Sequence, residues 1–187
     1  MKLKIIKFKS VNSTNDEAIK LVRSDKLNQG LVLTDLQTNG RGTMGKKWTS
    51  DKGNIFISIF FKVNLIKIKI ENYLIINAKI IQKILQEYTK KIIKIKKPND
   101  LLIEKKKVCG ILQEVIEHKN KKYLITGIGI NTKTLPLNKE FKSTSLKIYS
   151  KKDINNNIII GKIKNSYGKL IYDLNNYNAL YIKKKYK

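Results

Sequence analysis

Residues 55–61 constrain the fold of this chain more than any other segment. Their sequence, Ile-Phe-Ile-Ser-Ile-Phe-Phe, holds one polar side chain among six apolar ones. A short apolar run of this kind is typical of a strand that is buried on both faces, because a strand with one face in water alternates polar and apolar residues. The run therefore predicts a strand in the interior of a sheet.

The rest of the sequence supplies further strands and the helices that could cover them. Apolar residues recur at spacings of three and four in residues 72–90, which predicts an amphipathic helix there. Ser13 or Asn12 can cap an earlier helix whose first turn carries acidic side chains. The remaining patterns predict strands at 2–8, 31–36 and 93–96, a hairpin of 108–117 with 123–130, a glycine-bearing loop at 37–53, and one or two terminal helices from 153 onward.

Length and rare residues bound the class of protein. The 187 residues contain no internal repeat and no linker rich in Pro, Gly or Ser, so we expect one mixed α/β domain spanning residues 1–187. A single cysteine, Cys109, excludes a disulfide-stapled scaffold and a zinc ribbon, and a single histidine, His118, excludes Ser-His-Asp and HExxH catalysis. Residues 1–10 lack a continuous apolar stretch, and no apolar run reaches membrane-spanning length. We expect a soluble, reduced, cytoplasmic protein without a metal-binding cluster.

The net charge of +26 invites a nucleic-acid interpretation, because basic side chains neutralise phosphates. Among the 40 basic residues, however, Arg23 and Arg41 alone are arginines, and Ile and Asn are also heavily used. Lys, Ile and Asn are encoded by A/T-rich codons, so the base composition of the gene accounts for much of the charge. Nucleic acid is therefore not the expected partner, and a basic nucleic-acid-binding module is kept as an alternative.

A loop with three glycines carries the first candidate chemistry. Gly40-Arg41-Gly42-Thr43-Met44-Gly45 matches GxGxxG, but the helix and the acidic residue that a dinucleotide fold requires do not follow it. An arginine between two glycines instead fits an anion clamp, since backbone N–H groups can approach the anion and the guanidinium holds it at two points. Trp48 either covers an adenine or plugs the core beneath the loop, and an ordinary surface loop is the alternative.

A bare strand face is the second candidate feature. The predicted strand ending at Asn131 directs Gly127 and Gly129 to the same side as that asparagine. A face of this kind commonly marks a place where a ligand approaches the backbone. Lys96 alternates with apolar residues of its own strand and is expected to project from the sheet. Together with Arg41, these residues could form a pocket for a bound anion.

Five ordered motifs resemble those of the bacterial biotin protein ligases. They are Ser13-Thr14-Asn15; Gln37 with Gly40-Arg41-Gly42-Thr43-Met44-Gly45-Lys46-Lys47-Trp48; Lys96-Lys97-Pro98-Asn99-Asp100; Lys107-Val108-Cys109-Gly110-Ile111-Leu112-Gln113-Glu114; and Gly127-Ile128-Gly129-Ile130-Asn131. The resemblance covers residues 5–147. It implies the α+β fold of the biotin/lipoate ligase catalytic domain, a mixed and mainly antiparallel sheet with helices packed on one face. We expect the short form, without an N-terminal helix-turn-helix domain and without a C-terminal SH3-like barrel.

The resemblance also implies a reaction. Biotin and ATP give biotinyl-5′-AMP and pyrophosphate, with Mg²⁺ on the phosphates, and the acyl group then passes to one lysine of a biotin carboxyl carrier protein. The implied catalytic residues are Arg41 and Lys96, which would hold the biotin carboxylate and the acyl phosphate. The implied biotin-binding residues are Ser13, Thr14, Asn15, Gln37, Gly40, Arg41, Gly42, Thr43, Lys96, Gly110, Leu112, Gly127 and Gly129. The implied ATP-binding residues are Arg41, Lys46, Trp48, Lys96 and Asn131.

Some positions depart from the family's pattern, and some alternatives stay open. Thr43 stands where these ligases usually carry a second arginine that helps to retain the adenylate, and Lys97 replaces a usual tryptophan. Lipoate or octanoate transfer on the same fold is the nearest alternative, although its usual Arg-Arg-x-Ser-Gly-Gly-Gly loop is absent. A homologue that binds biotin without turnover and a homodimer both stay open. Asp100 is a candidate base for the acceptor lysine.

Overall fold

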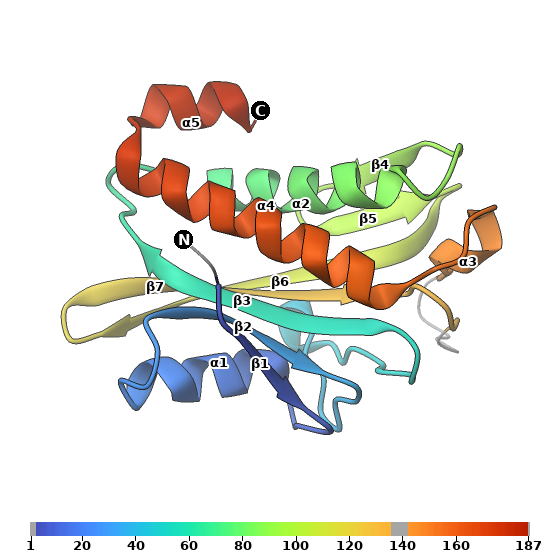
Figure 1. The fold of residues 1–187 in the computed structure, drawn as a ribbon, viewed down its shortest axis with the longest axis horizontal. Helices are drawn as coiled ribbons and strands as arrows, with labels where there is room; N and C mark the ends of the chain where they lie inside the picture. The colour runs from blue at the N-terminus through green and yellow to red at the C-terminus, as the bar shows by residue number, and fades with distance from the viewer. Residues whose placement is uncertain (1–2, 136–141, 187) are drawn as a thin grey trace.

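The computed structural model describes residues 3–135 and 142–186 and forms a seven-stranded sheet with helices on both sides (Figure 1). The strands are β1 (Ile5–Phe8), β2 (Gln29–Thr34), β3 (Ile55–Val63), β4 (Ile93–Lys96), β5 (Asp100–Ile103), β6 (Lys106–His118) and β7 (Lys121–Ile130). The helices are α1 (Thr14–Arg23), η1 (Thr43–Gly45), α2 (Ile70–Gln86), α3 (Leu146–Tyr149), α4 (Asn156–Asn176) and α5 (Ala179–Lys185). The strand order is β1-β2-β3-β7-β6-β5-β4, in which β1 and β2 run parallel and the other neighbours antiparallel. The expected mixed, mainly antiparallel sheet is confirmed.

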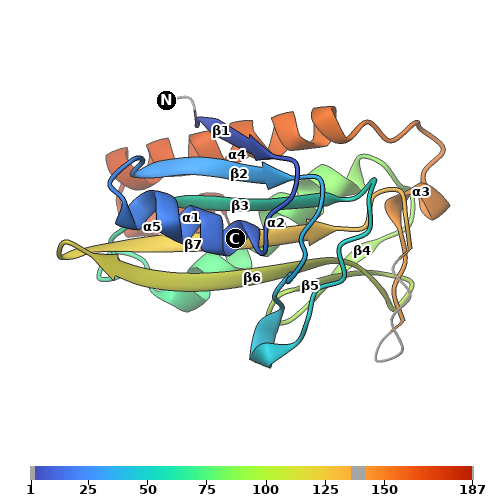
Figure 2. The same cartoon turned by 90° about the horizontal axis from the view of Figure 1, so that it is seen from below.

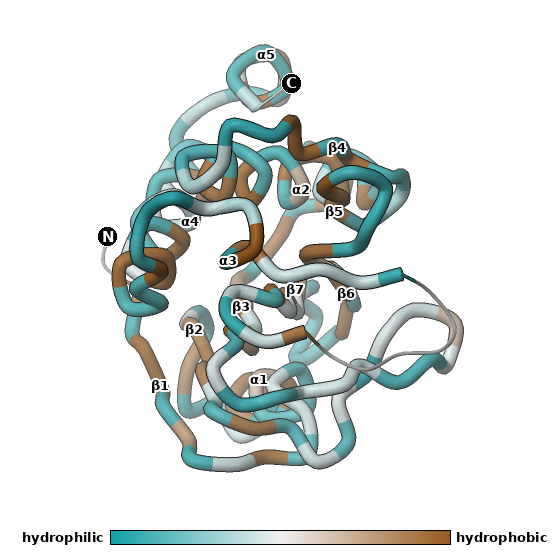
Figure 3. The backbone as a smooth tube through the Cα atoms, turned by 90° about the vertical axis from the view of Figure 1, so that its right-hand side faces the viewer, coloured by the Kyte–Doolittle hydropathy of each residue, from teal (hydrophilic) through white to brown (hydrophobic). Residues whose placement is uncertain are grey.

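Strand β3 is buried on both faces, as residues 55–61 predict. Ile59 packs in the larger apolar cluster with residues of α2 and α4, whereas Phe60 packs in a smaller cluster with Ala18 and Val22 of α1. In Figures 1 and 3, α2 and α4 lie on one side of the strands and α1 on the other. The two long helices thus share one face, in line with the expected fold, and α1 covers part of the opposite face.

The ends of several elements differ from those predicted. The helix expected at 72–90 spans Ile70–Gln86, and α1 begins after Ser13 as its N-cap. The strand expected at 31–36 spans Gln29–Thr34. Strand β5 has no counterpart among the predicted elements, because four residues beside a proline turn are too few to show a period. The hairpin of 108–117 with 123–130 is confirmed as β6 and β7.

The terminal helices expected from residue 153 onward are present as α4 and α5. Ile159, Ile163 and Leu170 of α4 are fully buried against the sheet and α2. Asp173 ties the end of α5 to α4, since Lys185 Nζ lies 2.6 Å and the Tyr186 hydroxyl 2.7 Å from its Oδ2. Among the helices within residues 3–135 and 142–186, none is both long enough and apolar enough to cross a bilayer.

Candidate active site

The site is assembled where residues 11–12 pair with residues 36–39. Val11 and Gln37 form an isolated parallel bridge, and the Thr38 amide donates to the Val11 carbonyl at 2.9 Å. This pairing carries Gln37 to the N-terminus of α1, where Ser13 is the cap. Two of the motifs that resemble the ligases therefore lie together.

The buried end of the resulting pocket is polar. The Thr14 amide donates to Gln37 Oε1 at 2.8 Å, and the Ser58 hydroxyl lies 2.7 Å from Thr14 Oγ1 and 2.5 Å from Asn15 Oδ1. Thr14, Asn15 and Ser58 are each no more than 3% exposed. Buried hydroxyl and amide groups require hydrogen-bond partners, so these side chains hold one another in fixed positions. We call Thr14, Asn15, Gln37 and Ser58 the polar floor.

Residues 40–48, which we call the glycine loop, form a tight hairpin beside this floor. The Trp48 amide donates to the Gly40 carbonyl at 2.8 Å, which closes the base of the hairpin. Met44 and Gly45 make the turn at its tip, with φ angles of 56° and 73° in the left-handed region. Figure 2 shows this tip as the cyan helical turn η1, extending beyond β6 next to the β5 end of the sheet.

The bare strand face is present, and side chains of the chain itself cover it. Gly110 of β6 pairs with Gly129 of β7, and a Cβ atom on either glycine would collide with the Trp48 indole. A Cβ on Gly127 would lie 2.5 Å from Asn15 Oδ1. The Trp48 indole therefore lies on the glycine backbone. Its Nε1 is buried and has no hydrogen-bond partner among the described residues.

A β-bulge brings Lys107 into the same pocket. The register between β5 and β6 skips Val108, so regular alternation along β6 is interrupted there. The interruption turns Lys107 to the face that carries Gly110. Lys107 Nζ lies 2.7 Å from Asp100 Oδ1 and 5.2 Å from the centre of the Trp48 ring, within the range of a cation–π contact.

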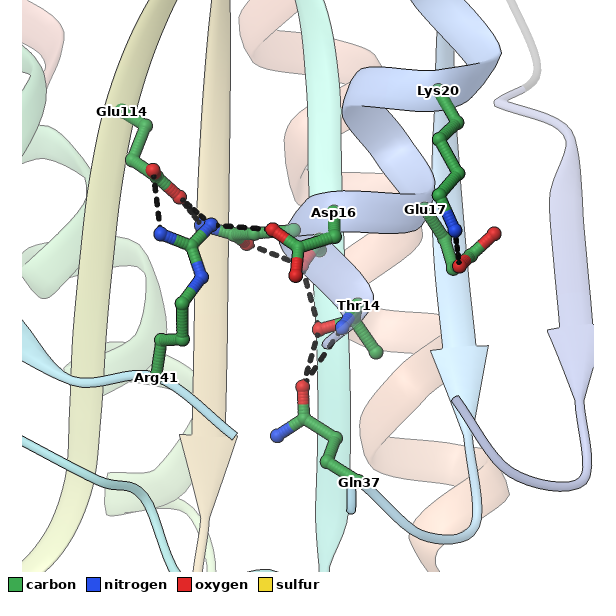
Figure 4. Close-up of polar contacts among 9 residues, drawn as sticks. Thr14, Asp16, Glu17, Lys20, Gln37, Arg41 and Glu114 are labelled. Atoms are coloured by element: carbon green, nitrogen blue, oxygen red, sulfur yellow. Dashed lines mark hydrogen bonds and ion pairs between the residues drawn. The ribbon is translucent and has the colours of Figure 1, made fainter. Parts of the chain in front are cut away.

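The guanidinium of Arg41 is held by two carboxylates. Its Nη1 and Nη2 donate to the two oxygens of Glu114 at 3.0 and 2.8 Å, and Nη2 also donates to Asp16 Oδ1 at 2.7 Å. Figure 4 shows Arg41 reaching from the glycine loop to Glu114 on β6 and to Asp16 on α1. The anions that Arg41 contacts here belong to the chain itself, and a contact with a ligand carboxylate stays a prediction.

Lys96 lies on the expected side of the sheet but outside the residues that line the pocket. It pairs with Asp100 of β5, which pairs in turn with Gly110 of β6. Lys96 is therefore two strands away from the glycine face, at an exposed edge. The cation that lines the pocket beside Trp48 is Lys107.

Three further predicted residues also lie outside the pocket lining. Asn131 is 1% exposed, and its Nδ2 donates to the Thr144 carbonyl at 3.1 Å, which fixes the chain after β7. Gly40 packs against the backbone of Trp48, where no Cβ would fit. Lys46 lies on the exposed side of the glycine loop. Roles for these residues in binding ATP or biotin stay predictions.

The pocket thus joins segments from the whole N-terminal two thirds of the chain. It is lined by Ser13, Thr14, Asn15, Gln37, Arg41, Gly42, Thr43, Trp48, Asn99, Lys107, Gly110, Ile111, Leu112, Gly127, Ile128 and Gly129. The sequence motifs predict no role for Asp16, Ser58, Lys107 or Glu114. Strand alternation could have indicated Glu114, because it shares a face with Gly110.

Comparison with known proteins identifies the family of the chain. A model of the biotin/lipoate A/B protein ligase family matches residues 7–131. The chain belongs to this family. Its structure is similar to biotin protein ligase from Aquifex aeolicus in complex with biotin and ATP, with 27% identity, a TM-score of 0.78, and coverage of 98% of this chain and 77% of that one.

Two more solved structures share the fold. Biotin protein ligase from Leishmania major in complex with biotin is 25% identical, with a TM-score of 0.73 and coverage of 87% of this chain and 72% of that one. A candidate lipoate protein ligase from T. acidophilum with bound lipoic acid is 9% identical, with a TM-score of 0.67 and coverage of 92% and 87%. At that identity the last match shows the fold alone. The name of the family covers ligases for biotin and for lipoate.

Proposed function

We propose that this protein is a biotin protein ligase. It activates biotin with ATP to biotinyl-5′-AMP and passes the biotinyl group to a lysine of a biotin carboxyl carrier protein in the cytoplasm. Family membership and the similarity to the A. aeolicus enzyme, whose structure contains biotin and ATP, support this proposal. The polar floor is the observation that favours biotin over lipoate.

The acyl groups differ in what they would present to the buried end of the pocket. Biotin ends in a ureido ring with N–H donors and a carbonyl acceptor, whereas lipoate and octanoate end in apolar groups. Thr14 and Asn15 line the pocket there with a hydroxyl and an amide group, and the buried Ser58 hydroxyl holds both side chains by hydrogen bonds. A site built to hydrogen-bond its substrate rejects an analogue that lacks those groups, because its own polar atoms are then left unpaired.

The first half-reaction needs positioning rather than a protein nucleophile. A carboxylate oxygen of biotin attacks the α-phosphorus of ATP, the new P–O bond forms, and pyrophosphate leaves. The chain contributes orientation and positive charge, which act on the charge that develops in the transition state. Arg41 and Lys107 are the cations that line the pocket, and Lys96 and Lys46 lie outside its lining.

Magnesium fits this site as a companion of the nucleotide. Among residues 3–135 and 142–186, no three His, Cys, Asp or Glu side chains are grouped as metal ligands, and the carboxylates of Asp16, Asp100 and Glu114 are paired with cations. Mg²⁺ usually binds through substrate phosphates and waters with one or two carboxylates. Carried on the triphosphate, it would neutralise phosphate charge during the transfer.

In the second half-reaction the acceptor amine attacks the acyl carbonyl of the adenylate, the amide bond forms, and AMP leaves. Asp100 is the candidate base for the amine, but it is paired with Lys107 at 2.7 Å. A role as base would require the Asp100 carboxylate to exchange this contact for one with the acceptor amine.

Exchange of pyrophosphate into ATP tests the proposal, because it reports adenylate formation without a carrier protein. Biotin should support exchange, and octanoate and lipoate should not. The variants Thr14→Val and Ser58→Ala should raise the KM for biotin by about tenfold or more, since each leaves buried partners unpaired. Exchange with octanoate or lipoate in the absence of biotin-dependent exchange would overturn the assignment.

A further inference from the structure

The contacts of Arg41 join three parts of the fold that are far apart in sequence. Arg41 belongs to the glycine loop, Asp16 to the first turn of α1, and Glu114 to β6. Glu114 holds the guanidinium at two points, and Asp16 adds a third contact at 2.7 Å. The side chain of Arg41 is 36% exposed, that of Asp16 39% and that of Glu114 26%. Two-point pairing in such a partly buried place is stronger and more directional than an exposed ion pair.

Glu114 also connects the loop to the polar floor. Asn15 Nδ2 donates to Glu114 Oε2 at 2.6 Å, and Asn15 Oδ1 accepts from the Ser58 hydroxyl. The same carboxylate oxygen accepts from Arg41 Nη2 at 2.8 Å. Glu114 is therefore the point where the residues under the pocket and the loop above it meet.

The closed loop leaves little room. The open volume in the pocket is about 40 Å³, with the Trp48 indole lying on Gly110 and Gly129. Sites for small organic ligands usually measure roughly 300–1,000 Å³. Lifting the glycine loop would carry Trp48 with it and enlarge the pocket for a ligand. Lifting the loop separates Arg41 from Glu114 and Asp16, which lie on the fixed sheet and helix.

We propose that Glu114 and Asp16 are positioning residues that latch the glycine loop shut through Arg41, and that this latch limits both entry of the acyl substrate and escape of the acyl-adenylate. The effect on the acyl substrate and the acyl-adenylate rests on the proposed function, whereas the position of the glycine loop does not. Arg41 acts here as the moving half of the latch, and Glu114 and Asp16 act through it without touching the substrate.

The test uses variants that remove the negative charge of Glu114 or Asp16 and keep the shape of the side chain. In Glu114→Gln the amide oxygen still accepts from Asn15, so the polar floor is retained, and Asp16→Asn removes the third contact. The variant Glu17→Gln is the matched control, because Glu17 lies on the same helix and pairs with Lys20 at 2.7 Å away from Arg41 (Figure 4). Trp48, the one tryptophan of the chain, reports the position of the loop through its fluorescence.

Without any ligand, quenching of Trp48 by acrylamide should increase in Glu114→Gln and increase further with Asp16→Asn, while Glu17→Gln matches the wild type. Quenching unchanged in the double variant would overturn the latch whatever the enzyme activates. With the adenylate formed in the site, its rate of loss should increase by about tenfold in Glu114→Gln, as expected for losing one charged hydrogen-bonded contact.

A double-mutant cycle separates a latch from a general loss of structure. Arg41→Gln and Glu114→Gln remove the same interaction from its two ends, so the combined variant should show a quenching change no larger than the greater of the single variants. Additive changes would contradict direct coupling between Arg41 and Glu114. If adenylate is never formed but the quenching results hold, the latch stands and the proposed function fails.

Discussion

The Trp48 indole packs on the backbone of Gly129 so closely that a Cβ atom there would collide with three of its ring atoms. Gly129→Ala should therefore displace the indole, shift its emission to longer wavelength and reduce biotin-dependent exchange. Forcing an extra methyl group into a packed place destabilises by roughly 1–3 kcal/mol. Fluorescence spectra and exchange rates of the purified variant check this, and an unchanged spectrum would show that Trp48 does not rest on the glycine.

A glycine-to-alanine substitution at Gly161 in α4 should stabilise the protein, in contrast to the same substitution at Gly129. A Cβ on Gly161 meets nothing within 4 Å, and α4 lies on the face away from the pocket. Gly161→Ala should raise the free energy of unfolding by about 0.5–1 kcal/mol, because alanine has less backbone freedom to lose in a helix. Thermal unfolding measures the gain. A lower melting temperature than the wild type would contradict it, and exchange activity should not change.

Lys107 and Lys96 are alternative candidates for the cation at the reacting phosphate. Lys107→Gln should lower the exchange rate by about 100-fold, the loss typical of removing one preorganised group from a charged transition state. Sequence resemblance predicts that Lys96→Ala and Arg41→Ala also abolish adenylate formation. Steady-state exchange assays decide between them, with Lys79→Gln on the far helix α2 as the control. Near-normal exchange in Lys107→Gln would reassign this lysine to holding Asp100.

Thr43 lines the pocket at the tip of the glycine loop, where related ligases usually carry arginine. Thr43→Arg should slow the loss of adenylate from the enzyme, because a guanidinium at this place adds a charged contact to the phosphate. Release of labelled adenylate followed after rapid dilution gives the rate. A release rate equal to that of the wild type would show that Thr43 does not govern retention.

The Cys109 thiol should be unreactive in the folded protein. It is 0% exposed, and burial raises the pKa of its thiol, which keeps it protonated at neutral and mildly alkaline pH. Alkylation at pH 8 should therefore be much slower in the native protein than in guanidinium chloride, where mass spectrometry should find one labelled thiol. Rapid labelling of the native chain would show that β6 opens locally.

The segments that meet in the pocket were expected from the resemblance of short motifs to those of the biotin protein ligases. Ser13, Gln37 and Gly129 were expected at one site and do line one pocket. The apolar run of β3 likewise predicted its own burial. Strand β5 could not be predicted, since four residues give no usable period and its pairing partners lie elsewhere in the chain.

The partners of the two cations in the pocket could not be predicted in the same way. Arg41 meets carboxylates that are 25 and 73 residues away in sequence, and tertiary packing alone brings them together. Lys107 is three residues from Gly110, an odd spacing that places the two on opposite faces of a regular strand. The bulge in β6 reverses that expectation.

The extra residue at Val108 makes the pocket depend on a count of residues as well as on their identities. Pairing β6 regularly through Val108, without the bulge, would turn Lys107 to the core face and separate it from Asp100, whereas deleting Val108 would leave Lys107 on the glycine face, two residues from Gly110. Substitutions along β6 leave that count intact, so a mutational scan would not reveal it. A sequence alignment without a gap at this position would equate Lys107 with a residue of an unbulged strand that points in the opposite direction.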